Sequence, residues 1–211
     1  MGQAILYYAT LALEALVGVF GIRLYQEPPY DIVDRLDSGL EIRRYAPRLA
    51  AEVELPVAGG SGRDEAFRLL FAYIAGANRA SASQAARIAM TMPVEVSNKQ
   101  RIAMTVPVQT GERSDTVRMR FFLPGKYTHN GAPKPADVRV RLVPIPDETV
   151  AILRFSGSGR DDARHQADLM TRLAASRWQP VGQPYTLYYD APFTLPFLRR
   201  NEAAVTVARA L

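Results

Sequence analysis

The sequence predicts an α+β fold: a distorted β-barrel of about eight strands with two helices, built from duplicated ββαββ halves related by a pseudo-two-fold axis and preceded by an N-terminal hydrophobic helix. Three observations predict it. An apolar stretch opens the chain, a six-residue motif recurs 97 residues later, and strand-like alternation flanks both copies of that motif. With 211 residues, 48% of them hydrophobic, the chain is long enough to bury a core of this size.

The N-terminal segment is apolar from residue 4 to residue 22, except for Thr10 and Glu14. As a helix it would span about 28 Å, close to the hydrocarbon thickness of a bilayer. No Lys or Arg precedes it, and no convincing cleavage site follows it. We therefore expect residues 1–25 to form an uncleaved transmembrane or signal-anchor helix that holds the protein in the inner membrane as a single-pass protein. The arginines after it leave the side of the globule undecided, because acidic neighbours and a long domain weaken the positive-inside rule.

One face of this expected anchor carries Glu14, Gly18 and Gly21 at spacings of three and four residues. Small residues and a carboxyl on one face are what a membrane helix offers to other membrane subunits. The alternative is that Glu14 is only tolerated in a lone anchor.

The repeated motif reads SGRDEA at 61–66 and SGRDDA at 158–163. Ser61 and Ser158 are candidate N-caps, each followed three residues later by an acidic residue, so both copies predict a helix start. The residues expected to face a sheet are Phe67, Leu70, Phe71 and Ile74 in the first helix, and Ala167, Met170, Leu173 and Ala174 in the second. We expect one domain over 26–211, with half one at about 38–124 and half two at about 136–209.

Strand-like segments stand on both sides of each helix. They are EIRRY, LAAEVEL and VRMRFFL around the first, and VRVRLV, TVAILRF, TLYYD and AAVTVA around the second. In VRMRF, we expect Val117, Met119 and Phe121 to point into the core, and Arg118 and Arg120 to point to solvent. Two such halves facing each other predict the curled sheet and an apolar cleft between them.

A nearly identical phrase of eight residues occurs twice, as RIAMTMPV at 87–94 and RIAMTVPV at 101–108. Pro93 and Pro107 interrupt backbone pairing, which favours an edge strand or a loop crossing. We expect the second copy to enter the sheet as a strand and the first copy to be a neighbouring extended segment. The methionines of these phrases are either a ligand wall or plain core.

Composition excludes several classes of function. The net charge is +5, but the arginines alternate with apolar residues instead of forming one basic stripe, so we expect no nucleic-acid partner. The chain has no Cys, and its only histidines, His129 and His165, are far apart and are expected to be structural or solvated. No hydrolase, kinase or dehydrogenase motif is present, so we expect a binding protein without catalytic residues.

The doubled phrase resembles the signature of the SOUL heme-binding protein family, bacterial members of which often also have an N-terminal hydrophobic segment. Other segments resemble the family in the same order, and the likeness covers about residues 26–209. They are EPPY, GLEIRRYAPRLAAEVE, DEAFRLLFAYIAGAN, MRFFLPGKYT, PKP, VAILRFSG and APFTLPFLRRNEAAVTV. The resemblance implies a distorted barrel and the binding of heme or another tetrapyrrole in a hydrophobic pocket beside the first helix.

Carried over by motif, the candidate ligand-binding residues are Phe67, Arg68, Phe71 and Ile74, to which the methionine-wall interpretation adds Met104 and Met119. Arg68 would pair with a heme propionate, or alternatively form a rim salt bridge with Asp64 or Glu65. Some family members have a proposed iron-ligating His where this chain has Arg44, which cannot ligate iron. The axial ligand is therefore absent, or is a Met, a Tyr or a His from elsewhere, and the metal ligands stay unidentified.

These observations lead to the hypothesis of a membrane-anchored, non-enzymatic tetrapyrrole-binding protein. The alternative is an accessory subunit of a membrane protein complex, with an empty or vestigial pocket. A third hypothesis, an effector sensor for other hydrophobic small molecules, rests on fold analogy alone.

Overall fold

The structure is a computed structural model that describes residues 26–37, 39–56, 62–79, 87–99, 116–190 and 194–210. The expected membrane segment and its Glu14/Gly18/Gly21 face lie outside these ranges. Among the helices that are described, none is long and apolar enough to cross a membrane.

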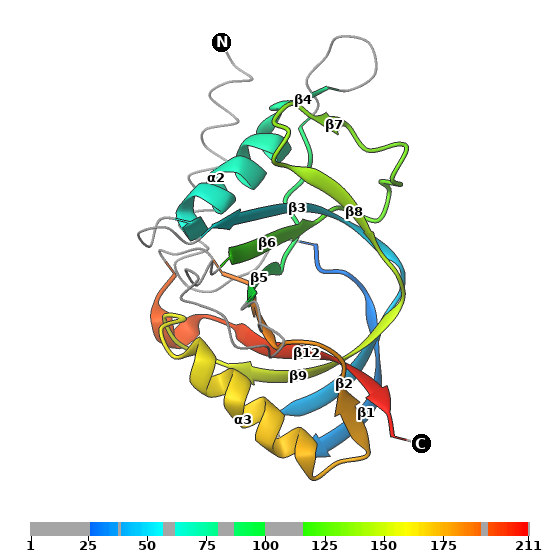
Figure 1. Ribbon diagram of the computed structural model, residues 1–211, viewed down its shortest axis with the longest axis vertical. Helices are drawn as coiled ribbons and strands as arrows, with labels where there is room; N and C mark the ends of the chain where they lie inside the picture. Colours follow the sequence, from blue (N-terminus) through cyan, green and yellow to red (C-terminus); the bar gives the residue numbers. More distant parts are fainter. Residues whose placement is uncertain are drawn as a thin grey trace, which may run out of the picture.

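The centre of the fold is one antiparallel sheet of ten strands that curls into a half-barrel (Figure 1). Its order is β1-β2-β9-β12-β11-β5-β6-β3-β8, and β10 pairs with β12 beside this path. The strands are β1 (Tyr30–Asp37), β2 (Leu40–Tyr45), β3 (Arg48–Pro56), β5 (Val94–Lys99), β6 (Thr116–Phe122), β8 (Arg141–Ile145), β9 (Glu148–Phe155), β10 (Trp178–Pro180), β11 (Tyr185–Tyr188) and β12 (Asn201–Arg209). A small second sheet pairs β4 (Asn78–Arg79) with β7 (Lys134–Pro135).

The strands expected around the two helices are present, with three differences. The sheet is an open half-barrel whose edges are β1 and β8, rather than a closed barrel. Three further strands, β1, β5 and β10, join the seven predicted strands that the structure describes, and β5 follows the first copy of the doubled phrase, which was not expected to lead into a strand. Strand β8 begins at Arg141, three residues later than the VRVRLV pattern indicated, because Asp137 accepts hydrogen bonds from the backbone and side chain of Arg139 and turns the chain there.

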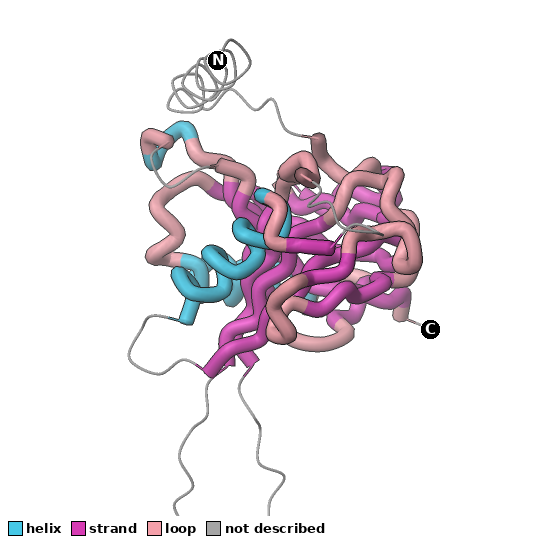
Figure 2. The backbone as a smooth tube through the Cα atoms, turned by 90° about the horizontal axis from the view of Figure 1, so that it is seen from above, coloured by secondary structure: helices cyan, strands magenta, loops and turns pink. Residues whose placement is uncertain are grey.

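The two helices lie on the outside of the curled sheet at opposite ends of the half-barrel, with the strands between them (Figure 1), and Figure 2 shows the same strands from above. Helix α2 (Gly62–Ala75) packs on β3 and β6, and α3 (Asp162–Ala174) packs on β9, β10 and β12. Alternate strand residues point to opposite faces, so Leu153 and Val205 pack under α3 while Ile152 and Ala204 face the concave side. The core thus has two outer layers, one beneath each helix.

Helix α2 begins directly after Ser61 and ends in a Schellman motif. Gly76, at φ +121°, donates its N–H to the carbonyl of Tyr73 at 3.3 Å, and Ala77 donates to that of Ala72 at 2.8 Å. Its buried face is centred on Ala66, Leu70, Tyr73 and Ile74. The buried face of α2 therefore differs from the predicted one. Phe67 lies at the margin of the buried face, and Phe71 lies outside it.

Helix α3 begins at Asp162, so the prediction that Ser158 caps it was wrong. Gly157 and Gly159, both with positive φ, turn the chain before the helix, and the N-cap position falls on Asp161, whose side chain makes no capping hydrogen bond. The helix buries Asp162, Leu169 and Leu173, whereas two of the predicted face residues, Ala167 and Ala174, are exposed.

The first copy of the doubled phrase is irregular but largely buried, and it leads into β5 at its last residue, Val94. Thr91 bridges to Gln26, and the Met92–Pro93 peptide bond is cis. The expected strand at 101–108 lies outside the described residues.

Candidate functional site

The outer flank of α2 carries three of the residues expected to contact a ligand. The half-buried ring of Phe67 meets Phe121 edge-on, with centroids 5.5 Å apart, and stacks on Phe71 at 6.0 Å. The Phe71 side chain is large and 49% exposed, so Phe121 supports Phe67 from the core while Phe71 meets solvent. The flank therefore presents a two-ring aromatic surface, suited to contact with a flat apolar ligand.

Arg68 lies next to these rings and is exposed. Its Nε donates to the backbone carbonyl of Asp64 at 3.4 Å, and Glu65 instead pairs with Arg139 at 2.8 Å. The rim salt bridge considered for Arg68 is thus not formed within the described residues. Its guanidinium is available to an anionic group on a ligand at this flank.

The other three candidates do not contribute side chains to that surface. Ile74 and Met119 are buried in the core cluster beneath α2, and Met104 lies outside the described residues. Met92 is buried in the same cluster. The described methionines at 92 and 119 are therefore core residues rather than a ligand wall.

The concave face of the half-barrel holds buried ion pairs that the sequence pattern did not reveal. Glu202, with no exposed surface, accepts hydrogen bonds from Arg43 at 3.0 and 3.2 Å, from Arg200 at 2.8 and 3.0 Å, and from the Tyr189 hydroxyl at 2.6 Å. Burial of Arg43 disfavours its charge, but Glu202, Tyr45 and Glu41 together outweigh this effect and raise the pKa of Arg43. Arg200 in turn pairs with Glu27 and fixes the start of the described chain to β12.

A second network occupies the other half of this face. Arg120 donates to Glu52 at 2.7 Å and to Glu95 at 3.1 Å, and Arg118 lies 3.8 Å from Glu95. Burial raises the pKa of Glu95, although the two arginines oppose that shift. The expectation that Arg118 and Arg120 face solvent was wrong, because the sheet curls over the face to which they point.

A cavity of about 870 Å³ opens at one end of the half-barrel. Five segments line it: residues 26–29, residues 46–49, Thr91, residues 123–129 without Lys126, and residues 144–146. Six of the lining residues are prolines, contributed by four of these segments. The pairing of Arg48 with Ile145 brings the β2–β3 and β8–β9 turns together here. None of the five predicted site residues that the structure describes lies in this lining.

Among the described residues that line the cavity, Arg48 is the single Arg or Lys. Its guanidinium carbon lies 4.0 Å from the ring centroid of Tyr45 and 4.5 Å from that of Phe122, and its Nη2 pairs with Glu148. Its Nε is buried and makes no hydrogen bond. One donor of a rigidly held cation is therefore unsatisfied beside the cavity.

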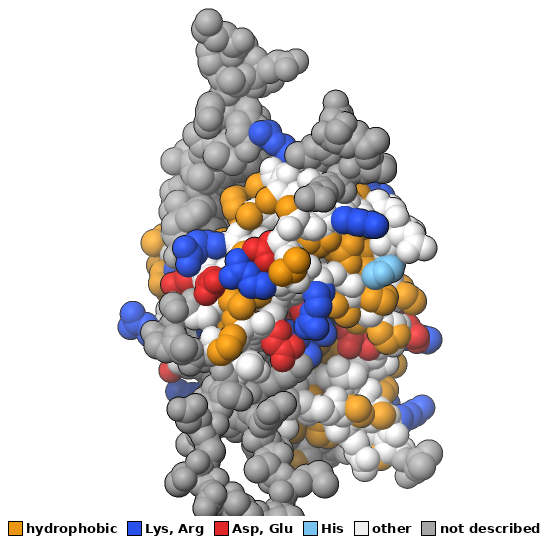
Figure 3. All heavy atoms as spheres, turned by 45° about the horizontal axis from the view of Figure 1, so that its top comes forward, with side chains coloured by type: hydrophobic (Ala, Val, Ile, Leu, Met, Phe, Trp, Pro, Cys, Tyr) orange, Lys and Arg blue, Asp and Glu red, His pale blue; other side chains and the backbone are white. Residues whose placement is uncertain are grey.

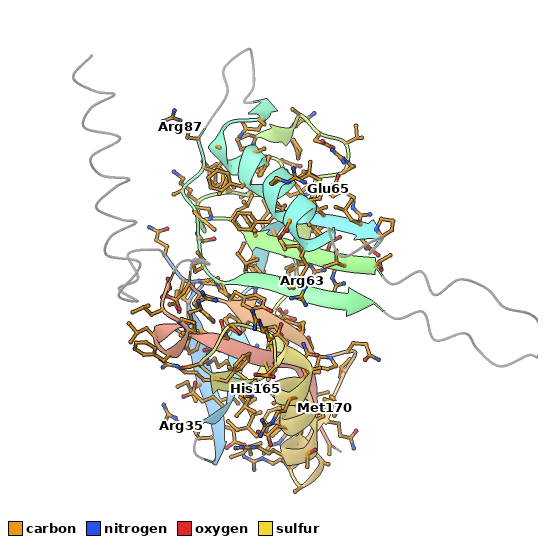
Figure 4. All side chains as sticks on the ribbon, turned by 90° about the vertical axis from the view of Figure 1, so that its left-hand side faces the viewer. Arg35, Arg63, Glu65, Arg87, His165 and Met170 are labelled. Carbon is orange, nitrogen blue, oxygen red and sulfur yellow. The ribbon has the colours of Figure 1, made fainter. Side chains whose placement is uncertain are left out.

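The two histidines occupy different environments. His129 lines the cavity, whereas His165 stacks on Phe155 on the outer face of the sheet, with centroids 3.9 Å apart. Figure 4 places His165 on α3, in the half of the molecule opposite Glu65 of α2. Arg44 is exposed on β2, 3.7 Å from Asp147, and does not line the cavity. Among the described residues, no group of three or more His, Cys, Asp and Glu side chains could hold a metal ion.

Sequence reasoning missed Arg48 and the cavity, although a signal was present. Pro47, Pro124, Pro144 and Pro146 each stand just beyond or near a strand end, where proline marks a turn. Only the strand order shows that these turns meet at the same end of the sheet.

Comparisons with known proteins agree with the fold. The SOUL heme-binding protein family model matches residues 25–206. No curated protein sequence matches the chain. Among solved structures, the C-terminal domain of EcmrR is similar with a TM-score of 0.59 and 10% identity, over 86% of this chain and 99% of that one.

Two further structures show the same arrangement of elements. A hydrolase from Listeria innocua aligns with a TM-score of 0.51 and 11% identity, over 79% of this chain and 91% of that one. EcmrR in its complex with DNA aligns with a TM-score of 0.58 and 10% identity, over 99% of this chain and 64% of that one. At such identities the likeness concerns the fold alone. The family match spans nearly the whole described globule, and the chain therefore belongs to the SOUL heme-binding protein family.

Proposed function

We propose that this protein binds heme or a related tetrapyrrole without catalysing a reaction on it. The observation that carries the proposal is membership of a heme-binding family over residues 25–206. The aromatic flank of α2 supports it, because an exposed ring lies next to the exposed guanidinium of Arg68, which has a single long hydrogen bond to a backbone carbonyl, and the two match a flat apolar ligand with carboxylates at its edge.

At this flank, Phe67 and Phe71 would contact the macrocycle and Arg68 would pair with a propionate. Ile74 and Met119 support the flank only from beneath, because both are buried. The sequence of α2 contains no His or Met. The flank therefore fits the macrocycle and its carboxylates, and it would bind a porphyrin with or without iron.

Titration of the full chain in mild detergent tests the proposal. Hemin should give a saturable change of the Soret band, and metal-free protoporphyrin IX should give saturable fluorescence. Arg68→Ala should weaken protoporphyrin binding about tenfold, since it removes a charge-assisted hydrogen bond. Arg164→Ala removes an exposed Arg on α3 and serves as the matched control. The absence of saturable binding with any porphyrin would overturn the function, while an unaffected Arg68→Ala would overturn only the flank.

Membrane anchoring is the second part of the proposal. It is supported by the apolar stretch at 4–22, which ends a few residues before the described globule begins at Gln26. Carbonate extraction should leave the protein in the membrane pellet. Because the chain has no Cys, Lys126→Cys gives one exposed thiol, and its labelling in intact cells by an impermeant maleimide reports the side of the membrane.

Internal duplication also remains a proposal. Exchanging β2 with β8, β3 with β9, β5 with β11 and β6 with β12 converts the order of these eight strands into its own reverse. Each half then contributes one helix to the outer face. A duplicated ββαββ unit with a pseudo-two-fold axis requires a strand order that becomes its own reverse when the two halves are exchanged.

The accessory-subunit alternative makes an opposite prediction for the same preparation. Co-purification of other membrane subunits without porphyrin absorbance, through the Glu14/Gly18/Gly21 face, would favour it. A monodisperse pigment-bound monomer after gentle detergent extraction would favour tetrapyrrole binding.

A further inference from the structure

We propose that the tip of the connection between β11 and β12 docks on the surface of the phospholipid bilayer in which the N-terminal segment is anchored. The tip consists of Leu195, Pro196 and Phe197, in and beside the short helical turn η1 (Pro196–Leu198). The inference rests on the membrane-anchoring part of the proposed function. It adds a second, interfacial contact that fixes the orientation of the globule on the membrane.

The tip exposes apolar side chains that a globule ordinarily buries. Phe197 is 71% exposed and Leu195 is 38% exposed, and Pro196 between them is exposed as well. Large apolar residues that are exposed together, rather than singly, mark a contact with another protein or with a membrane. Aromatic and aliphatic residues beside basic ones are typical of a membrane interface. The segment from Thr194 to Arg200 fits that pattern, because it contains two arginines and no acidic residue.

Local hydrogen bonds hold the tip in one conformation. Leu198 donates its N–H to the carbonyl of Leu195 at 2.9 Å, and Arg199 donates its N–H to the carbonyl of Pro196 at 3.2 Å. The Nε of Arg199 also donates to the carbonyl of Thr194 at 2.7 Å, across the base of the turn. The aromatic ring is therefore presented to its surroundings by a closed turn, and docking would order little additional chain.

The start of the described chain is fastened to the base of this tip. Glu27 accepts hydrogen bonds from Arg200 at 3.0 and 3.2 Å, and Arg200 follows Phe197 by three residues. The carbonyl of Gln26 accepts the N–H of Met92 at 3.0 Å, which fixes the start of the chain to a second segment. The apolar stretch at 4–22 ends four residues before Gln26, a length of chain that spans at most about 14 Å. An anchor at 4–22 therefore holds this side of the globule close to the bilayer.

The figures place the tip and two arginines on one side of the molecule. Figure 2 shows η1, the short cyan turn, projecting from the globule on the same side as the point where the described chain begins. This side is the rear of Figure 1 and the left of Figure 4, where Arg35 and Arg87 extend outward. Both arginines are exposed, and basic side chains at a bilayer surface are attracted to anionic headgroups. Figure 3 shows part of the other side, where acidic and basic side chains surround the hydrophobic ones.

Docking needs only a modest gain in free energy, because the anchor makes it an intramolecular step. A short tether keeps the effective concentration of the tip at the surface high. Transfer of one exposed phenylalanine ring into apolar surroundings favours the docked state about tenfold or more. The ring of Phe197 is therefore sufficient to keep the tethered globule docked most of the time.

Single thiols test the proposal, because the chain has no Cys. Phe197→Cys and Val138→Cys, each labelled with the fluorophore nitrobenzoxadiazole, are compared in the full-length protein, reconstituted into vesicles of phosphatidylcholine with about 30% phosphatidylglycerol. Val138 is the matched control because it is 94% exposed and lies elsewhere. Its neighbour Arg139 pairs with Glu65, which Figure 4 places away from the proposed docking side. Since both side chains are exposed, neither replacement removes a buried contact.

Spin-labelled lipid should quench the label at position 197 severalfold more than the label at position 138, and the emission at 197 should shift to the blue. Omitting phosphatidylglycerol or adding salt should weaken that quenching, because both reduce the attraction of the arginines to the surface. Equal quenching at the two positions would overturn the docking. A blue shift at 197 without quenching by lipid would also overturn it, since the tip would then contact protein.

Carbonate extraction of the same variants reports on the anchor separately. A protein that stays in the membrane pellet while its label at position 197 is unquenched would refute the docking alone. A protein that carbonate releases would refute the anchoring on which the docking rests.

Discussion

Replacing Glu202 with Gln would leave the guanidinium of Arg43 buried without its principal counter-charge. The substitution keeps the shape of the side chain, so it tests charge rather than packing. Arg43 has a side chain only 5% exposed, and Glu202 has none of its surface exposed. Removing one partner of such a pair costs about 3–5 kcal/mol, because the remaining charge is desolvated.

The structure places the expected cost at the lower end of that range. Arg43 keeps its second partner, Glu41, at 2.7 Å, and Arg200 keeps Glu27 at 3.0 Å. We therefore expect a loss of about 3 kcal/mol in the free energy of unfolding. With an m-value of about 2 kcal/mol per molar urea, the unfolding midpoint should fall by about 1.5 M. Fluorescence of Trp178, the single tryptophan, follows the transition.

The matched control is Glu65→Gln. Glu65 pairs with Arg139 on the surface, where both side chains are more than 40% exposed, and an exposed pair contributes at most about 1 kcal/mol. If Glu202→Gln lowered the stability no more than Glu65→Gln does, the concave-face network would not be the determinant of stability that its burial indicates.

Three further predictions concern single sites. Gly76→Ala should destabilise the fold by about 1 kcal/mol in urea unfolding, because φ of +121° is strained for any residue with a Cβ. Phe121→Ala should cost about 3–5 kcal/mol and Phe71→Ala far less, because the first ring is buried and the second half-exposed; equal losses would contradict the packing. Hydrogen bonds from Arg139 lower the pKa of Asp137 from 3.8 to about 2, so the pair stabilises the fold above pH 3.8 and ceases to do so as the pH falls through 2. NMR titration should show that pKa returning toward 3.8 in Arg139→Ala.

Local periodicity predicted most of the strands but not their surroundings. In β6, the alternation correctly separated Val117, Met119 and Phe121 from Arg118 and Arg120. It could not show that the arginine face is the concave one, because both faces of a curled sheet can be covered. The partners Glu52 and Glu95 come from strands far away in the sequence.

For the candidate site, too, local sequence predicted the element but not which of its residues are buried. The motif at DEAFRLLFAYI identified α2 and its aromatic residues, but helical spacing alone placed Phe71 on the buried face, where Tyr73 is found instead. One turn of helix holds residues on every side, so the sheet beneath decides which of them are buried. The position of the strand under α2 is not a local property.

Family membership, most of the succession of helices and strands, and the lack of cysteine follow from the sequence alone, since they depend on residue identity and on short-range periodicity. The inside of the half-barrel depends on tertiary structure. The burial of Arg43 with Glu202 and the meeting of Arg48 with His129 around one cavity both depend on pairing between β2 and β9 and between β3 and β8. Those pairings join segments about a hundred residues apart, and long-range register is set by the packing of the whole sheet rather than by any single segment.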